Sequence, residues 1–253
     1  MTPLPVLICI PHSGQKMPEE LEGRVVINKQ EVFEDSDAYT KEIYDLGSKV
    51  LSVISTEYAR AFVDVNRNLD DLPPKMEDGL IKSMTCYEHP IYNEGKEPDE
   101  ELIQKLISTY YETYHKQIIR ALNNPELQLA LDCHSMADTA PKISPDVGEK
   151  RPSVCLGNCL DKTSSRETIS KLAKCFQDAF GLPPEEVKIN KPFTGKYTSQ
   201  TYGLKPVPWI HVELNRKLFL EKPWFDKNSL SINKSKLTEL NKKFEKSLEL
   251  FFL

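Results

Sequence analysis

Short apolar runs that end in polar side chains recur along the chain and predict strands buried in a sheet. Val6–Ile10 stops just before His12, and the run formed by residues 127–131 leads toward His134. A third run, Trp209–Leu214, follows the same design near the end of the chain. Open α/β sheets carry their chemistry at the carboxyl ends of their strands. The polar residues at these ends are therefore the first candidates for a functional site.

Between these runs, apolar residues recur at helical spacing. Helices are expected over residues 98–122, 164–181 and 234–252, and an amphipathic helix is expected to begin near Ser36 and to present Ile43, Leu46, Val50 and Leu51. Further short strands are expected at residues 52–55, 62–65 and 153–156. The alternation of strands and helices predicts an α/β fold with a central mixed, mostly parallel sheet. No linker-like segment divides the chain, so we expect one domain over residues 1–253.

The composition narrows the class of partner. The 253 residues carry a net charge of −5 and no long basic run, which disfavours nucleic acid and anionic membranes as main partners. No run has the length of a membrane span. Because the first ten residues lack a basic region and a long apolar segment, we expect no signal peptide. The six cysteines are scattered without a CxxC pair, so we expect reduced thiols and a cytoplasmic location.

The strand ends offer the residue types of a zinc site. His12 and His134 with one carboxylate would leave a tetrahedral zinc ion one open position for water, whose pKa the metal lowers. The carboxylate could come from Asp35 or Asp37, which lie in an acidic stretch after the first strand. Glu213 interrupts an otherwise apolar strand, and a carboxylate is rarely buried there unless it is paired or catalytic.

Two arginines bracket residues 62–65, the segment expected to form a short strand. Arg60 and Arg67 could clamp a carboxylate through paired hydrogen bonds, although ordinary surface salt bridges remain the commoner role for a single arginine. The sequence alone leaves both readings open.

Five short motifs occur in the order found in the N-formylglutamate amidohydrolase family, which the chain resembles over roughly residues 6–220. The motifs are Pro11-His12-Ser13-Gly14, Asp64-Val65-Asn66-Arg67, Asp132-Cys133-His134-Ser135, Asn190-Lys191-Pro192-Phe193-Thr194-Gly195 and Glu213-Leu214-Asn215-Arg216. The resemblance implies a three-layer α/β sandwich like that of zinc carboxypeptidases and aspartoacylase-like hydrolases. One departure is Lys196, which stands where the family's loop commonly has glycine, while Tyr197 is retained.

The resemblance also implies a role for each residue. His12 and His134 would be zinc ligands, with Asp37 preferred over Asp35 as the third. Glu213 would be the general base. The remaining implied roles are Arg60 for stabilising the oxyanion, Asn66 and Arg67 for holding the substrate carboxylate, Arg216 as a further substrate or structural arginine, and Tyr197 in the substrate pocket.

These implications predict a zinc-dependent amidohydrolase that removes a formyl-type N-acyl group from a small acidic amino acid such as N-formylglutamate. The expected partner is that small substrate, and neither nucleic acid nor a membrane is expected as a partner. Two alternatives remain. One is a zinc carboxypeptidase acting on short or modified peptides. The other is a binding protein with the same fold and no turnover, which would have no need of Glu213 buried in its strand.

Overall fold

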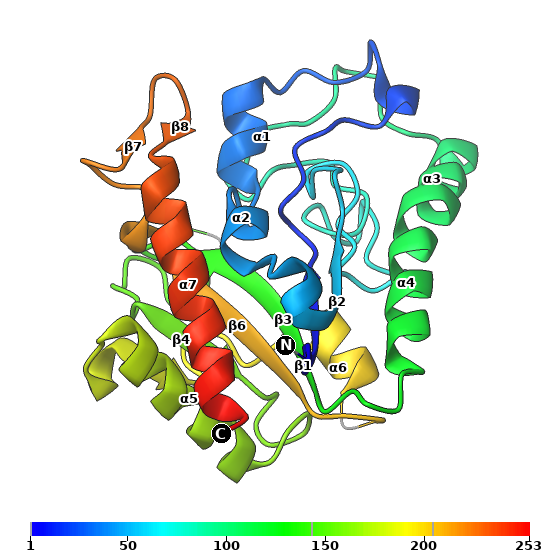
Figure 1. Ribbon diagram of the computed structural model, residues 1–253. Helices are drawn as coiled ribbons and strands as arrows, with labels where there is room; N and C mark the ends of the chain where they lie inside the picture. Colours follow the sequence, from blue (N-terminus) through cyan, green and yellow to red (C-terminus); the bar gives the residue numbers. More distant parts are fainter. Residues whose placement is uncertain (1, 143, 204) are drawn as a thin grey trace.

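A six-stranded sheet forms the centre of the molecule (Figure 1). The computed structural model describes residues 2–142, 144–203 and 205–253. The strands lie in the order β2-β1-β3-β6-β4-β5. Their bounds are Leu4–Ile10 for β1, Val50–Ser55 for β2, Leu129–Met136 for β3, Val154–Gly157 for β4, Val187–Ile189 for β5 and Trp209–Asn215 for β6. All neighbouring pairs are parallel except β4 with β6, which confirms the mixed, mostly parallel sheet.

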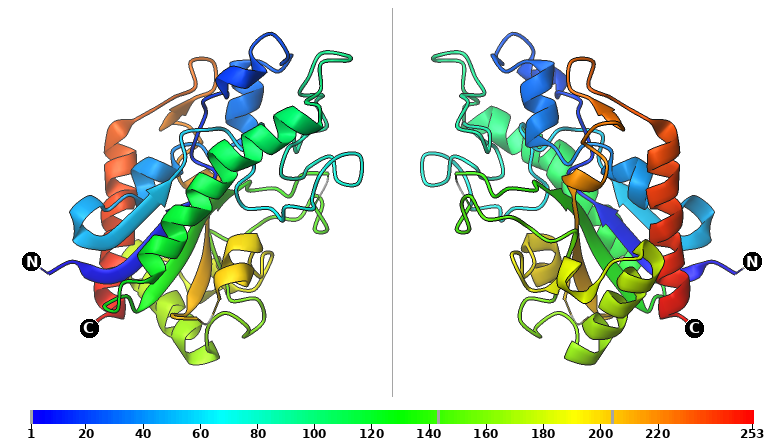
Figure 2. Two further views of the ribbon diagram at one scale, coloured as in Figure 1. Left: turned by 90° about the vertical axis from the view of Figure 1, so that its right-hand side faces the viewer. Right: turned by 90° about the vertical axis from the view of Figure 1, so that its left-hand side faces the viewer.

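Helices cover both faces of this sheet and make the fold three-layered (Figures 1 and 2). One face carries α2 (Thr40–Tyr44), α5 (Arg166–Phe180) and α7 (Lys234–Phe251). The other carries α4 (Glu112–Leu122) and α6 (Tyr197–Tyr202). The remaining elements are α1 (Lys29–Asp35), α3 (Glu100–Leu106), which continues through a π-helical stretch (Ile107–Tyr111) into α4, and a hairpin of β7 (Phe225–Asp226) and β8 (Ser231–Ile232). In the described part of the chain, no helix has both the length and the apolar character needed to cross a bilayer.

The alternation of side chains along the strands divides the interior into two cores. Leu131 and Cys133 of β3 join the core beneath α5 and α7, whereas Ala130 joins the core beneath α4. Because alternate residues of a strand share a face, Asp132 and His134 lie on the face of Ala130. The site residues of β3 therefore sit on the face that α4 and α6 cover.

The ends of α5 follow from local chemistry. The side chain of Ser165 accepts a hydrogen bond from the backbone N–H of Thr168, and Gly181 closes the helix in the left-handed conformation with φ 68°. Apolar residues at helical spacing, among them Leu172 and Phe176, turn toward the sheet and are fully buried.

Two expected elements are wrong. The helix expected near Ser36 does not exist as one unit, because α1 ends at Asp35, Tyr39 adopts a left-handed φ of 64°, and Val50 already belongs to β2. Its apolar spacing arose because α2 and β2 face the same core. The strand expected at residues 62–65 is a turn, in which the N–H of Val63 donates to the carbonyl of Ala59. Short buried runs do not by themselves distinguish strand from loop.

Candidate metal and catalytic site

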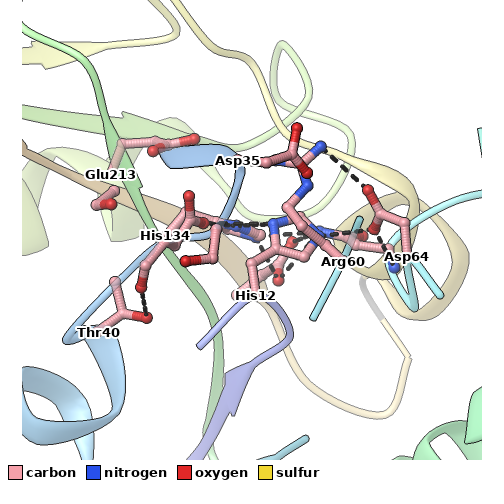
Figure 3. A network of polar contacts seen from close by, with 12 residues as sticks. His12, Asp35, Thr40, Arg60, Asp64, His134 and Glu213 are labelled. Atoms are coloured by element: carbon pink, nitrogen blue, oxygen red, sulfur yellow. Dashed lines mark hydrogen bonds and ion pairs between the residues drawn. The ribbon is translucent and has the colours of Figure 1, made fainter. Parts of the chain in front are cut away.

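Two histidines meet at the carboxyl ends of adjacent strands. His12 follows β1 and His134 lies in β3, and their Nδ1 atoms are 3.1 Å apart (Figure 3). The turn between α1 and α2 brings Asp37 to the same point, with Oδ2 3.3 Å from His12 Nδ1 and 3.0 Å from His134 Nδ1. This turn is tied to the first strand end, because the backbone N–H of Asp37 donates to the carbonyl of His12.

Close packing of the chain allows His12 to hold this place. A Cβ on Gly14 would lie 2.4 Å from backbone atoms of Glu57 and Tyr58, so only glycine permits the two segments to meet.

The three donor atoms fit a divalent metal ion. In a tetrahedral zinc site with bonds of about 2 Å, ligand atoms lie roughly 3.3 Å from one another, and the three distances here are 3.0, 3.1 and 3.3 Å. Two ring nitrogens that face each other at 3.1 Å need either a shared proton or a cation between them. All three side chains are almost fully buried, as a fixed metal site requires.

Partners behind the donors orient them. His12 Nε2 lies 2.7 Å from Asp64 Oδ1, and His134 Nε2 lies 2.9 Å from Asp132 Oδ1. A carboxylate can only accept, so each Nε2 carries a proton and each Nδ1 is left to face the metal position. The other oxygen of Asp37 accepts from Arg216 Nη2 at 3.0 Å.

The charges of this cluster stabilise one another. Burial opposes the ionised form of Asp37, but its close contacts with His12 and His134 outweigh this effect and hold the pKa of Asp37 well below its ordinary value. Burial likewise opposes ionisation of Asp64, and the neighbouring His12 and Arg60 overcome it and lower the pKa of Asp64. Both carboxylates are therefore ionised at neutral pH and available to a cation and its ligands.

Strand β6 adds a second row of polar groups beside β3. The register pairs Asp132 with His211 and His134 with Glu213 across the two strands. His211 lies between two carboxylates, with Nδ1 3.2 Å from Asp132 Oδ2 and Nε2 3.0 Å from Glu213 Oε1. Both nitrogens must donate, which favours the protonated ring. Burial alone would lower the pKa of His211, but hydrogen bonds to Asp132 and Glu213 raise it above its ordinary value.

His211 thereby fixes Glu213 and leaves one oxygen open. Among the described residues, no hydrogen-bond partner meets Glu213 Oε2, although this atom is buried. Glu213 as a whole is 5% exposed and lines the same cavity as His12 and His134. Such an arrangement presents a carboxylate oxygen to whatever molecule enters the cavity.

The cavity measures about 230 Å³ and brings together most residues that the sequence singled out. Of the nine residues preferred for a role by the family resemblance, seven line it: His12, Asp37, Arg60, Arg67, His134, Glu213 and Arg216. Two do not. Asn66 lies deeper, where its amide donates to Asp132 Oδ2 at 3.1 Å and its Oδ1 accepts from the N–H of Thr198. Tyr197 packs in α6 against Tyr111, with ring centroids 6.5 Å apart.

The arginines of the cavity are held by acids. Arg60 Nη2 lies 3.0 Å from Asp64 Oδ2, while its buried Nε has no partner in the described part of the chain. Arg67 donates to the side chain and the carbonyl of Asp78. Arg216 uses all three nitrogens, on Ser135 Oγ, on two backbone carbonyls and on Asp37.

Asp35 belongs to a different pair from Asp37. It accepts from the fully buried Lys82 at 3.1 Å and from the backbone N–H of Cys86 at 2.7 Å. Burial opposes its ionisation, but the charges of Lys82 and Arg60 lower the pKa of Asp35 to about 2. Asp35 lines the cavity, yet its carboxylate pairs with Lys82 rather than with the two histidines.

Three groups of this site were not singled out from the sequence. Asp64 stands in the second of the five motifs, but the sequence assigned it no role. Lys82 pairs with Asp35, 47 residues away, and no local pattern marks it. His211 had a visible signal, because His211 and Glu213 repeat the two-residue spacing of Asp132 and His134.

Comparison with known proteins points to one family. The family described as N-formylglutamate amidohydrolase matches residues 4–220. A relative from Pseudomonas putida, named N-formylglutamate deformylase, is 25% identical over 86% of this chain and 82% of its own length. A relative of the same name from Pseudomonas aeruginosa is 26% identical over 82% of this chain and 78% of its own.

A solved structure shows the same fold. The N-formylglutamate amidohydrolase from Ralstonia eutropha JMP134 superposes with a TM-score of 0.80 at 19% identity, covering 100% of this chain and 94% of that one. The gene product Atu2144 from Agrobacterium tumefaciens gives a TM-score of 0.60 at 13% identity over 98% of this chain and 89% of its own. This chain therefore shares its overall fold with these proteins.

Proposed function

The chain belongs to the N-formylglutamate amidohydrolase family, and from this we propose that it hydrolyses the amide bond of an N-formylated acidic amino acid, with N-formylglutamate as the leading substrate. The two relatives named N-formylglutamate deformylase support this choice of substrate. The observation that carries the proposal is the meeting of three metal-type donors and the open oxygen of Glu213 in one cavity.

The metal we propose is zinc, held by His12, Asp37 and His134. Two imidazole nitrogens and a carboxylate oxygen are a donor set typical of catalytic zinc sites. When bound, the ion would polarise the formyl oxygen and lower the pKa of a water molecule. Asp64 and Asp132 would keep both histidines in the required tautomer, and Arg216 would hold the carboxylate of Asp37.

Glu213 would act as the general base. Its open oxygen accepts a proton from the attacking water, whose oxygen forms a bond to the formyl carbon, and it then passes this proton to the leaving nitrogen as the C–N bond breaks. Formate and the free amino acid are the products. His211 holds the other oxygen of Glu213 and thereby keeps the base aimed at the cavity.

Arg60 suits the role of stabilising negative charge that develops on the formyl oxygen. Its Nη2 is held by Asp64, and its buried Nε is an open donor at the cavity. We assign Arg216 and Asn66 to supporting roles instead of substrate contact, because the hydrogen-bonding groups of both are engaged by Asp37, Asp132 and their neighbours. Tyr197 would support the cavity wall from α6.

Replacing Glu213 by glutamine tests the proposal. The amide has nearly the same shape and still accepts from His211, but it cannot take up the proton, so we expect turnover of N-formylglutamate to fall by roughly 10²–10⁴-fold. Zinc content and melting temperature should stay near those of the wild type. Glu126→Gln, at an exposed turn before β3, is the matched control and should behave as wild type. Full activity in a zinc-loaded Glu213→Gln protein would remove Glu213 from the mechanism.

A further inference from the structure

Lys196 brings an unbalanced positive charge to the cavity. It lies just before α6 and lines the same space as Glu213 and Arg67. Within the described residues, its ammonium group makes no ion pair, and the hydrogen bonds of this residue are made by its backbone, which donates to and accepts from Ser199 Oγ. Its side chain is thus available to a ligand.

The other cations of the cavity differ from Lys196 because each already has a carboxylate. The pairs and their distances are Arg60 with Asp64 at 3.0 Å, Arg67 with Asp78 at 2.8 Å, Arg151 with Asp146 at 2.9 Å and Arg216 with Asp37 at 3.0 Å. An entering anion would have to compete with an internal acid for any of these arginines. At Lys196 it would meet no such competitor.

The surroundings make this charge costly while nothing binds it. Burial lowers the pKa of Lys196, and the positive charges of Arg67 and Arg60 lower it further. A buried charge is stabilised by an opposite charge at close range. An anionic group in the cavity would supply that charge, and the protein itself supplies none within ion-pairing distance.

The backbone of the loop holds Lys196 in place. A Cβ on Gly157 of β4 would lie 2.5 Å from the backbone of Thr194, so the loop rests directly on the sheet. The ring of Phe193 supports the lysine, whose Nζ lies 5.9 Å from the ring centroid, and the guanidinium of Arg151 lies 4.8 Å from the same centroid. This support favours a fixed recognition group over a freely moving surface lysine.

We propose that Lys196 determines substrate specificity by binding one carboxylate of the substrate, so that the enzyme selects N-acyl amino acids that carry a carboxylate at that position. This inference rests on the proposed function and adds to it the residue that recognises the anionic group. The arginines then stabilise the cavity and the reacting oxygen, while Lys196 binds the carboxylate that distinguishes the substrate.

The test compares Lys196→Gln with the wild type on N-formylglutamate, on N-formylglutamine, which lacks the side-chain carboxylate, and on the α-amide of N-formylglutamate. Loss of a charge-assisted hydrogen bond should lower kcat/KM by roughly 10- to 100-fold on the diacid. One of the two amide substrates already lacks the carboxylate that Lys196 binds. On that substrate, Lys196→Gln should have nearly the kcat/KM of the wild type. Lys196→Arg should restore part of the loss on the diacid.

Lys191→Gln is the matched control, because Lys191 lies exposed in the same loop and does not line the cavity. It should keep the wild-type ranking of the three substrates. Similar losses on all three substrates in Lys196→Gln would overturn the inference and reduce Lys196 to a structural residue.

Direct binding separates this inference from the proposed function. Calorimetry with glutarate as the probe should show salt-dependent binding to the zinc-loaded wild type that weakens in Lys196→Gln and persists in Lys191→Gln. If the wild type hydrolyses none of the three substrates but glutarate binding depends on Lys196, the proposed function fails and the carboxylate site stands. Equal binding by the wild type and Lys196→Gln, or no binding by either, would overturn the carboxylate site.

Discussion

Asp35 and Asp37 are both buried acids two residues apart, and we expect opposite consequences when each is replaced by asparagine. Asp37 Oδ2 lies within 3.3 Å of both histidine Nδ1 atoms, whereas Asp35 is paired with Lys82. Asp37→Asn should therefore remove metal binding, and Asp35→Asn should remove stability. The pair offers a matched comparison, since each change removes one negative charge and almost no volume.

The magnitudes follow from the contacts. Loss of a partner behind a metal ligand typically weakens metal binding 10- to 100-fold, so loss of the ligand Asp37 itself should cost more than about 100-fold in zinc affinity. Removing one member of a buried ion pair typically costs 3–5 kcal/mol. Lys82 would retain its ion pair with Asp78 at 2.5 Å. We therefore expect the loss of unfolding free energy in Asp35→Asn to lie near the lower end of that range, at about 3 kcal/mol. For a chain of this size that corresponds to a fall in melting temperature of roughly 6–12 °C.

The assay measures zinc affinity by competition with a chelator and measures melting after the metal has been stripped from all proteins. Asp35→Asn should keep nearly wild-type zinc affinity and melt earlier. Asp37→Asn should lose zinc at chelator concentrations that the wild type withstands. If Asp35→Asn weakens zinc binding more than Asp37→Asn does, the assignment of the third ligand is refuted.

Two further predictions concern the groups around the site. Asp64→Asn should lower zinc affinity by roughly 10- to 100-fold, because His12 loses the carboxylate that sets its tautomer, and an unchanged affinity in chelator competition would contradict that role. His115 donates from Nε2 to the carbonyl of Val65, and burial lowers its pKa from 6.5 to about 4. The neutral ring therefore stabilises the fold fully above pH 6.5, and this contribution, at most about 3 kcal/mol, is lost as the pH falls through 4. The free energy of unfolding in urea should decline less steeply between pH 7 and 4 for His115→Gln than for the wild type. Equal slopes would refute this role of His115.

The sheet could be predicted because its sequence signal is local. The strands β1, β3 and β6 are rich in apolar residues. The polar residues of the site lie just after β1 and within β3 and β6. Periodicity failed where the core was shared between different elements. Ile43 of α2 and Val50 of β2 point into one core, and their spacing imitates a single helix.

The candidate site was predictable to the extent that its residues sit at strand ends. His12, His134 and Glu213 could be placed from the strands alone, because parallel strands end at one edge of the sheet. The partners of the arginines could not, since nothing near Arg67 in sequence shows that Asp78 will occupy its guanidinium. The same holds for Asp35, whose separation from the histidines depends on Lys82, 47 residues away.

The pairing of β3 with β6 has a consequence for how this protein can change in evolution. Every residue of both strands is buried, and along each strand the side chains alternate between the helix-covered core and the face that holds the site. No position on them is free to vary without affecting either folding or chemistry. Loop residues are not constrained by both folding and chemistry in this way. The loop before α6 brings Lys196 to the cavity. Divergence in substrate preference, whether by natural drift or by directed evolution, is therefore expected to accumulate in the loops around a sheet that stays nearly fixed.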